Sequence, residues 1–214
     1  NKFAHGNVEY VQGVGIDLDR FDSSGTVFAK RSELGVSNDD HMILAVGDLI
    51  KRKNHQCIIR ALAELDDHYK LFICGTGVEE KSLKALVSEL GLGSRVSFLG
   101  FRKDIPTLMH DSDMLVFPSI HEGLPVTVME AMASGLPVIA TRIRGVVPDL
   151  LKSGVNGIVL DNDEPGTVAD AIERLATDPA KAKALAVAAM EDSKCFAVNK
   201  IVSNVASIYM KVLA

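Results

Sequence analysis

Two glutamates flank the start of an apolar helical segment, at a spacing that could serve a ligand with several polar groups. Glu122 and Glu130 stand with seven residues between them in HEGLPVTVMEAMASGLPV, residues 121–138. Thr127, Glu130 and Ser134 form a thin polar stripe on this helix. A carboxylate among apolar side chains needs a partner, because unpaired burial is costly. A ligand diol such as a ribose would offer it two hydroxyl donors, and the plainer alternative is a narrow solvated face.

The start of this helix predicts a site for an anion. Pro125 is typical of a first helical turn, which leaves Leu124 in the capping position, and leucine cannot accept a bond from the exposed amides. The free N–H groups around Val126 and Thr127, together with the positive end of the helix dipole, would suit a phosphate oxygen. Two alternatives stay open: water satisfies these amides, or Glu122 folds back as an acidic cap.

The elements that position these residues alternate in type along the chain. Apolar runs of strand length are each followed by a loop and a helical pattern. Such alternation predicts an α/β fold, with a doubly wound, mostly parallel Rossmann-like sheet covered by helices on both faces. The predicted strands are residues 42–46, 71–74, 96–99, 114–117, 138–140 and 158–160. Two further helices are predicted at residues 179–193 and 199–214.

The loops after these strands concentrate positive charge at one edge of the predicted sheet. Ligands of open parallel sheets bind at the carboxyl ends of the strands, so these loops should form the site. That several loops of an acidic chain agree favours an anion such as a phosphate, although surface loops are often charged in any case. The loop residues in question are Lys51, Arg52, Lys53, Gly75, Gly77, Arg102, Lys103, Glu122, Gly123, Arg142 and Arg144.

Composition limits the classes of protein to which the chain could belong. Its 214 residues, 47% hydrophobic and 24% charged, are ordinary globular material, and a net charge of -5 argues against a nucleic-acid binder. No apolar run approaches the length of a membrane helix. The scattered Cys57, Cys74 and Cys195 lack a metal or redox spacing, so we interpret them as reduced core thiols of a cytoplasmic protein.

Two motifs could indicate a cofactor, and both have plainer explanations. The GTG at residues 75–77 lacks the third glycine of a dinucleotide fingerprint and an acidic ribose partner about 20 residues later. The Asp-x-Asp triplets at residues 17–19 and 161–163 could hold a metal, but they are also typical of turns and helix caps. We therefore expect neither a metal nor another cofactor.

The chain resembles family 4 retaining glycosyltransferases, whose architecture is the two-domain GT-B fold. EGLPVTVMEAMASGLPVIAT is similar to the Glu-seven-residues-Glu signature of that family. Other similar stretches are QGVGIDLDRF, AVGDLIKRKNH, CGTG, FLGFRKD and IRGVVPDLLKSGVNGIVL. The KNH and TRIRG stretches resemble the branch that builds capsular and extracellular polysaccharides. The resemblance covers nearly the whole chain.

The resemblance implies that the chain is the C-terminal, donor-binding half of such an enzyme, inactive by itself. Residues 1–20 would be an interdomain strand or linker and 21–194 the nucleotide-sugar-binding domain. Residues 195–214 would form a helix that packs on an N-terminal acceptor domain. The donor would be a nucleoside diphosphate sugar, UDP rather than GDP, and the acceptor a saccharide or polyprenyl-linked saccharide. The full-length protein could associate peripherally with the inner face of the membrane.

The resemblance also assigns roles to single residues. Glu130 would bind the ribose hydroxyls, and Lys53 would pair with the diphosphate. Glu122 would approach the donor sugar and its phosphate, helped by the amides of Gly123 and Leu124. Phe101 and Arg102 would meet the nucleobase. The remaining donor-site residues would be Gly47, Asp48, Arg52, Gly75, Gly77, His121, Pro125, Val126, Thr127, Arg142 and Arg144.

This chain departs from the family at two positions. Asp48 stands where the family usually has an arginine that helps to neutralise the diphosphate, so either Arg52, Arg142 or Arg144 compensates or the geometry of the donor differs. Val14 replaces the usual asparagine of the entry turn. Two other functions stay open: a non-catalytic subunit of the same fold that scaffolds or regulates an active partner, and a sugar-nucleotide epimerase.

Overall fold

One parallel sheet organises the molecule. In the computed structural model, residues 14–21, 30–143 and 147–213 are described. The sheet has six strands in the order β3-β2-β1-β4-β5-β6, all pairs parallel. The strands are β1 (His41–Val46), β2 (Tyr69–Cys74), β3 (Val96–Gly100), β4 (Met114–Phe117), β5 (Val138–Thr141) and β6 (Ile158–Leu160). The sequence prediction of a doubly wound α/β fold is confirmed.

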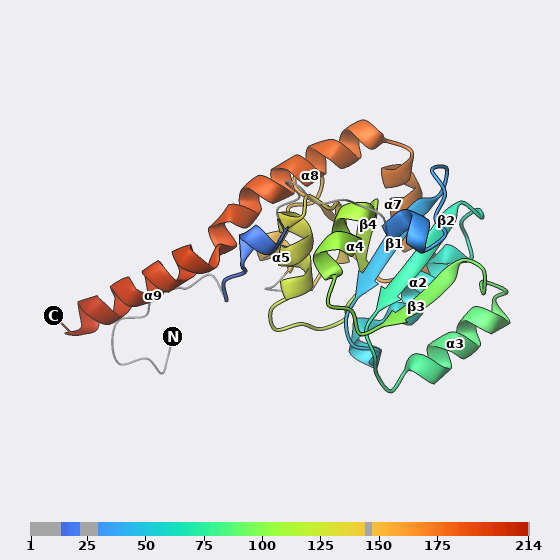
Figure 1. Ribbon diagram of the computed structural model, residues 1–214, viewed down its shortest axis with the longest axis horizontal. Helices are drawn as coiled ribbons and strands as arrows, with labels where there is room; N and C mark the ends of the chain where they lie inside the picture. Colours follow the sequence, from blue (N-terminus) through green and yellow to red (C-terminus); the bar gives the residue numbers. More distant parts are fainter. Residues whose placement is uncertain (1–13, 22–29, 144–146, 214) are drawn as a thin grey trace.

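Helices follow the strands and cover the sheet (Figure 1). The α-helices are α1 (Lys30–Glu33), α2 (His55–Leu62), α3 (Glu80–Glu89), α4 (Ile105–Asp111), α5 (Val126–Ala133), α6 (Val147–Leu150), α7 (Pro165–Ala176), α8 (Pro179–Ser193) and α9 (Val198–Leu213). The described residues also form the short 3-10 helices η1 (Leu18–Phe21), η2 (Lys51–Lys53) and η3 (Lys194–Phe196). No helix in the described ranges is long and apolar enough to cross a membrane.

The alternation of side chains along each strand divides the core into two clusters. In β1, Ile43 and Ala45 face one cluster, which also contains the buried faces of α2, α3 and α7. Met42 and Leu44 face the other cluster, with α4 and α5. Because β4 and β5 are buried on both faces, they appear as continuous apolar runs in the sequence, whereas the edge strand β3 is only partly buried. Helix α8 joins the two layers, since its Leu185 belongs to the first cluster and its Ala189 to the second.

The order in which successive strands are added to the sheet reverses between β1 and β4. From β1 the chain proceeds outward to β2 and β3, then returns to β4 on the other side of β1. The two strands pair through Ile43↔Met114 and Leu44↔Leu115, so the loops that follow them diverge from neighbouring positions. In open α/β sheets, this switch point at the carboxyl edge is where ligands bind.

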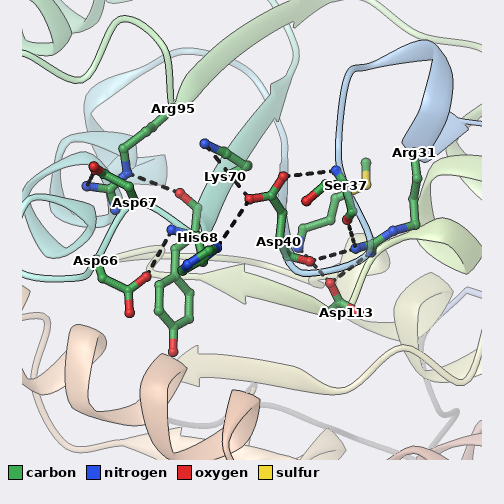
Figure 2. A network of polar contacts seen from close by, with 11 residues as sticks. Arg31, Ser37, Asp40, Asp66, Asp67, His68, Lys70, Arg95 and Asp113 are labelled. Carbon is green, nitrogen blue, oxygen red and sulfur yellow. Dashed lines mark hydrogen bonds and ion pairs between the residues drawn. The ribbon is translucent and has the colours of Figure 1, made fainter.

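The opposite, amino edge of the sheet carries a dense polar network (Figure 2). The Arg31 guanidinium donates to Asp113 Oδ2 at 2.9 Å and to the backbone oxygen of Asp40 at 2.6 Å. Asp113 Oδ2 also accepts the Met42 N–H at the start of β1, and Asp40 Oδ2 accepts the Ser37 N–H. These groups satisfy one another, so we assign them the structural role of fastening α1 to the sheet.

Candidate functional site

The loops after β1 and β4 bring two cations onto one buried carboxylate. Glu122 is 7% exposed. Its Oε1 lies 2.7 Å from Lys53 Nζ, and its Oε2 lies 2.9 Å from Arg52 Nη1. The Ser119 hydroxyl donates to Glu122 Oε1 at 2.6 Å. Lys53 and Glu122, both singled out in the sequence, therefore meet at the switch point between β1 and β4.

These neighbours keep the Glu122 carboxyl ionised. Burial by itself would raise the pKa of this carboxyl, since it penalises the charged form. The hydrogen bonds from Lys53 and Ser119 and the nearby positive charges outweigh burial, and the pKa lies below its usual value. Glu122 is therefore an ionised counter-ion of Lys53 and Arg52 at neutral pH.

Lys53 is held in a narrow position above the end of the sheet. Its ammonium lies 5.1 Å from the centre of the Phe117 ring. A Cβ on Gly47 would lie 3.2 Å from Lys53 Cε, and Gly47 has φ +153, so glycine here leaves room for the lysine stem. His55, next in α2, is buried, and burial lowers its pKa to about 4. The ring is thus neutral, and η2 supplies the positive charge through Arg52 and Lys53.

The start of α5 differs by one residue from the prediction. Pro125, not Leu124, is the N-cap, because the helix begins at Val126. The Val126 N–H donates back to the Leu124 oxygen at 3.0 Å, so it is not free. Among the described residues, no acceptor is found for the amides of Gly123, Leu124 and Thr127. These amides and the helix dipole can still hold an anion, and Glu122 does not cap them, because it turns toward Lys53.

Glu130 lies one turn into α5 and is half-buried. Its side chain has no hydrogen bond or ion pair within the described part of the chain. Burial raises the pKa of this carboxyl, and the Arg20 guanidinium acts in the opposite direction. Arg20 comes from η1, which packs against α5. No spacing in the sequence indicates Arg20, because it approaches Glu130 only through the packing of η1 against α5.

The loop after β2 contacts the loop after β1, and the loop after β3 follows the edge strand beyond β2. A Cβ on Gly75 would lie 2.0 Å from the Gly47 oxygen, and one on Gly77 would lie 2.4 Å from the Leu49 oxygen. These glycines let two loops touch, which is a packing reason for them beside the predicted donor contact. Phe101, at the end of β3, is 76% exposed. Arg102 donates two hydrogen bonds to the Asp104 carboxylate, which lowers the pKa of Asp104 to about 2.

Among the described residues, Arg142 and Asp48 form no hydrogen bond or ion pair with Lys53 or Glu122. Arg142 pairs with Asp161 at 2.7 Å across the ends of β5 and β6, where both line a hollow of about 140 Å³. Asp48 is exposed, and Arg144 lies outside the described residues. His121 is exposed, and its backbone oxygen accepts a bond from Arg52 Nη1 at 3.1 Å. Of the two described arginines that could compensate for Asp48, Arg52 shares the Glu122 carboxylate with Lys53, whereas Arg142 pairs with Asp161.

The motifs that suggested a metal or a reactive thiol have structural explanations. Asn162 accepts the Glu164 N–H at 3.0 Å, as in a turn, and Asp163 accepts a bond from Asn54 at 2.8 Å. Within the described ranges, no three His, Cys, Asp or Glu side chains are placed to hold a metal. Cys57 and Cys74 are free and buried, and burial raises the pKa of each thiol to about 12. The prediction of a core position is wrong for Cys195, which is only partly buried.

The chain resembles a known family and several known proteins. A sequence model of the family described as "Glycosyl transferases group 1" matches residues 27–192. The putative glycosyltransferase EpsD of Bacillus subtilis is 29% identical over 209 residues, which are 95% of this chain and 55% of EpsD. The lipopolysaccharide core biosynthesis glycosyltransferase LpsE of Rhizobium meliloti is 32% identical over 163 residues, 75% of this chain and 47% of LpsE.

The fold of the chain also matches solved glycosyltransferase structures. The chain superposes on Anabaena HepE, crystallised with UDP and glucose, with a TM-score of 0.86 and 30% identity. That match covers 92% of this chain and 55% of HepE. HepE has also been crystallised with UDP-glucose. The chain spans about half the length of the relatives that it matches.

Proposed function

Since the chain belongs to the glycosyl transferases group 1 family, we propose that it is the donor-binding half of a retaining GT-B enzyme of family 4. The enzyme transfers a sugar from a nucleoside diphosphate donor, preferably UDP-linked, to a saccharide or polyprenyl-linked saccharide acceptor. Its role is polysaccharide synthesis of the capsular or extracellular type, and it acts in the cytoplasm or at the inner face of the membrane. The relatives EpsD and LpsE and the UDP complexes of HepE support this proposal.

One observation carries the proposal. At the crossover between β1 and β4, the Lys53 ammonium and the Arg52 guanidinium converge on the residue that precedes the uncapped amides of Gly123 and Leu124. Cations and backbone N–H groups together are the means by which proteins bind a diphosphate. The half-buried Glu130, with no donor of its own among the described residues, is suited to the two hydroxyls of a ribose.

The chemistry follows from the charge that must be stabilised. When the sugar–phosphate bond breaks, negative charge develops on the departing diphosphate, and fixed positive groups lower the barrier by binding it more strongly then. In this proposal Lys53, Arg52 and the amides before α5 supply that stabilisation, without a metal. Glu122 holds the cations in position and faces the donor sugar, and it is not assigned the role of a nucleophile.

The substitution at Asp48 fits this scheme if Arg52 takes over the missing positive charge. The Arg52 side chain is 44% exposed and is bonded only through Nη1 among the described contacts, so it is free to turn toward a phosphate. Arg142 is less suited, because Asp161 already neutralises it. The exposed Phe101 offers a surface for the nucleobase at the neighbouring end of β3.

Isothermal titration calorimetry of this chain with UDP and GDP tests the proposal. We expect UDP to bind, and Glu130→Ala to weaken binding about 10- to 100-fold, because it removes the charged acceptor of two ribose hydroxyls. Glu89→Ala, at an exposed position in α3, is the matched control and should bind UDP like the parent. A chain that binds neither nucleotide would support the non-catalytic scaffold instead. Hydrolysis or isomerisation of a UDP-sugar without acceptor would indicate an epimerase.

A further inference from the structure

Ser119 occupies an unusual position between the sheet and the candidate site. It follows the end of β4 by two residues and is 1% exposed. Its hydroxyl lies 2.6 Å from Glu122 Oε1 and 3.1 Å from the backbone oxygen of Arg52. One buried hydroxyl therefore touches both the carboxylate of the site and the backbone of the η2 segment that supplies the two cations.

The hydroxyl has a single proton, and the two acceptors compete for it. The ionised carboxylate is the stronger acceptor, and the shorter distance is to Glu122. The Arg52 oxygen is already satisfied by the Ile120 N–H at 2.8 Å. The proton of Ser119 is therefore committed to Glu122 as long as Glu122 is ionised.

The backbone of Ser119 is itself fixed by the neighbouring strand. The Thr141 hydroxyl, 6% exposed at the end of β5, donates to the Ser119 oxygen at 2.7 Å. The last backbone pair between β4 and β5 is Phe117↔Ala140, so this bond continues the strand pairing where β4 leaves the sheet. Two hydrogen bonds thus form a relay from β5 to Glu122. In the first the Thr141 hydroxyl donates to the backbone oxygen of Ser119, and in the second the Ser119 hydroxyl donates to Glu122.

We propose that Ser119 is a positioning residue that holds the Glu122 carboxylate in place when a donor diphosphate draws Arg52 and Lys53 away from it. This inference rests on the proposed function. In the ligand-free chain both cations are bonded to Glu122. A diphosphate would compete for these cations, whereas the hydrogen bond from Ser119 to Glu122 would remain. Glu122 then keeps its charge and its orientation toward the donor sugar.

A direct test follows the carboxyl group of Glu122 without any ligand. The charged groups that act on it among the described residues are Lys53 and Arg52 from η2, and both stay in every variant. In chain labelled with ¹³C-glutamate, we expect Ser119→Ala to raise the proton affinity of Glu122 about tenfold, because a charge-assisted hydrogen bond is lost. Ser119→Thr should restore the parent titration.

Two further variants separate positioning from packing. Ser112→Ala removes another serine hydroxyl, bonded to the Leu108 oxygen in the α4–β4 connection, and should leave the titration of Glu122 unchanged. Thr141→Val removes the first bond of the relay and should shift the titration in the same direction as Ser119→Ala, by less. If Ser119→Ala does not fold, Thr141→Val carries the test. An unchanged Glu122 titration in the folded variants would overturn the inference.

The functional consequence is tested with ligands of known composition. We expect Ser119→Ala to weaken binding of the tightest of UDP-glucose, UDP-galactose and UDP-N-acetylglucosamine about tenfold, with UDP itself changed less than about twofold. Equal weakening of UDP would overturn the inference and leave the proposed function standing. If the parent chain binds neither UDP nor a UDP-sugar, the proposed function fails, whereas the carboxyl titration still decides the role of Ser119 toward Glu122.

Discussion

The two glutamates of the signature, eight positions apart, sit in opposite electrostatic environments. Glu122 accepts bonds from Lys53, Arg52 and Ser119, and its pKa is lowered although burial opposes this. Among the described residues, Glu130 is affected by burial and by the charge of Arg20, and its pKa is raised. In this ligand-free structure the same residue type thus serves as a counter-ion in one place and, within the described residues, as an acceptor without a donor in the other. An unsatisfied polar group inside an apolar helix face is a cost that a ligand can offset.

We expect Glu130→Gln to stabilise the chain at neutral pH. A raised pKa means that the folded carboxyl favours its proton more than the unfolded one does. Its contribution is therefore fully present below the unfolded pKa of about 4.3 and is lost as pH rises through the folded pKa. Glutamine never ionises, so Tm should rise about 1–3 °C at pH 7 and match the parent at pH 3. An equal difference at both pH values, measured by calorimetry, would contradict this explanation.

Between neighbouring elements, the site depends on how closely the loops after β1 and β2 approach. The Gly47 N–H donates to the Cys74 oxygen, and the Leu49 N–H donates to the Thr76 oxygen. Gly75 has φ +144 and lies so close to the Gly47 oxygen that a side chain cannot fit. Gly75 and Gly77 therefore allow the two loops to pack closely, and this packing fixes the position of η2 and Lys53 relative to the sheet.

Gly75→Ala should destabilise the chain by about 2–4 kcal/mol, because the new Cβ overlaps backbone and the φ angle disfavours alanine. Gly93→Ala is the matched control, since a Cβ there meets nothing within 4 Å and no positive φ is present. It should change stability by less than about 1 kcal/mol. Urea denaturation measures both. Similar losses in the two variants would show that the close approach of the loops is not the cause.

At the scale of the whole molecule, the described segments nearest the two ends of the chain meet. The Ile16 N–H donates to the Phe196 oxygen at 2.8 Å, and the Val198 N–H donates to the Ile16 oxygen at 2.9 Å. Ile16 and Phe196 are buried in the same cluster as α5. Beyond this clasp α9 extends away from the sheet (Figure 1), with Val202, Tyr209 and Met210 exposed. The clasp sets the direction in which α9 leaves the domain, and a partner domain for α9 stays a prediction.

Ile16→Ala should loosen this clasp. Burial of the isoleucine side chain is worth about 2–5 kcal/mol against alanine, so the junction should open more often. We expect the Val198 amide to exchange with deuterium at least about tenfold faster, while amides in β1 change much less. Val202→Ala, 60% exposed on α9, should leave the exchange at Val198 unchanged. Uniformly faster exchange throughout the sheet would indicate global destabilisation instead.

The sequence by itself determined the fold class and predicted the sheet edge at which the candidate site lies. The central strands β4 and β5 are buried on both faces and appear as unbroken apolar runs followed by polar loops, and this pattern is local. Proline at position 125 marked the start of α5 to within one residue. These features were predictable because each depends on neighbours within a few positions along the chain.

Only the tertiary structure decided which charges neutralise one another. Arg52 and Lys53 pair with Glu122, Arg142 pairs with Asp161, and Arg20 reaches the surroundings of Glu130. From the sequence, all the loop cations were equal candidates for the diphosphate. Ion pairs form through space between loops that leave adjacent strands, and the order of those strands across the sheet is set by the packing of the whole core.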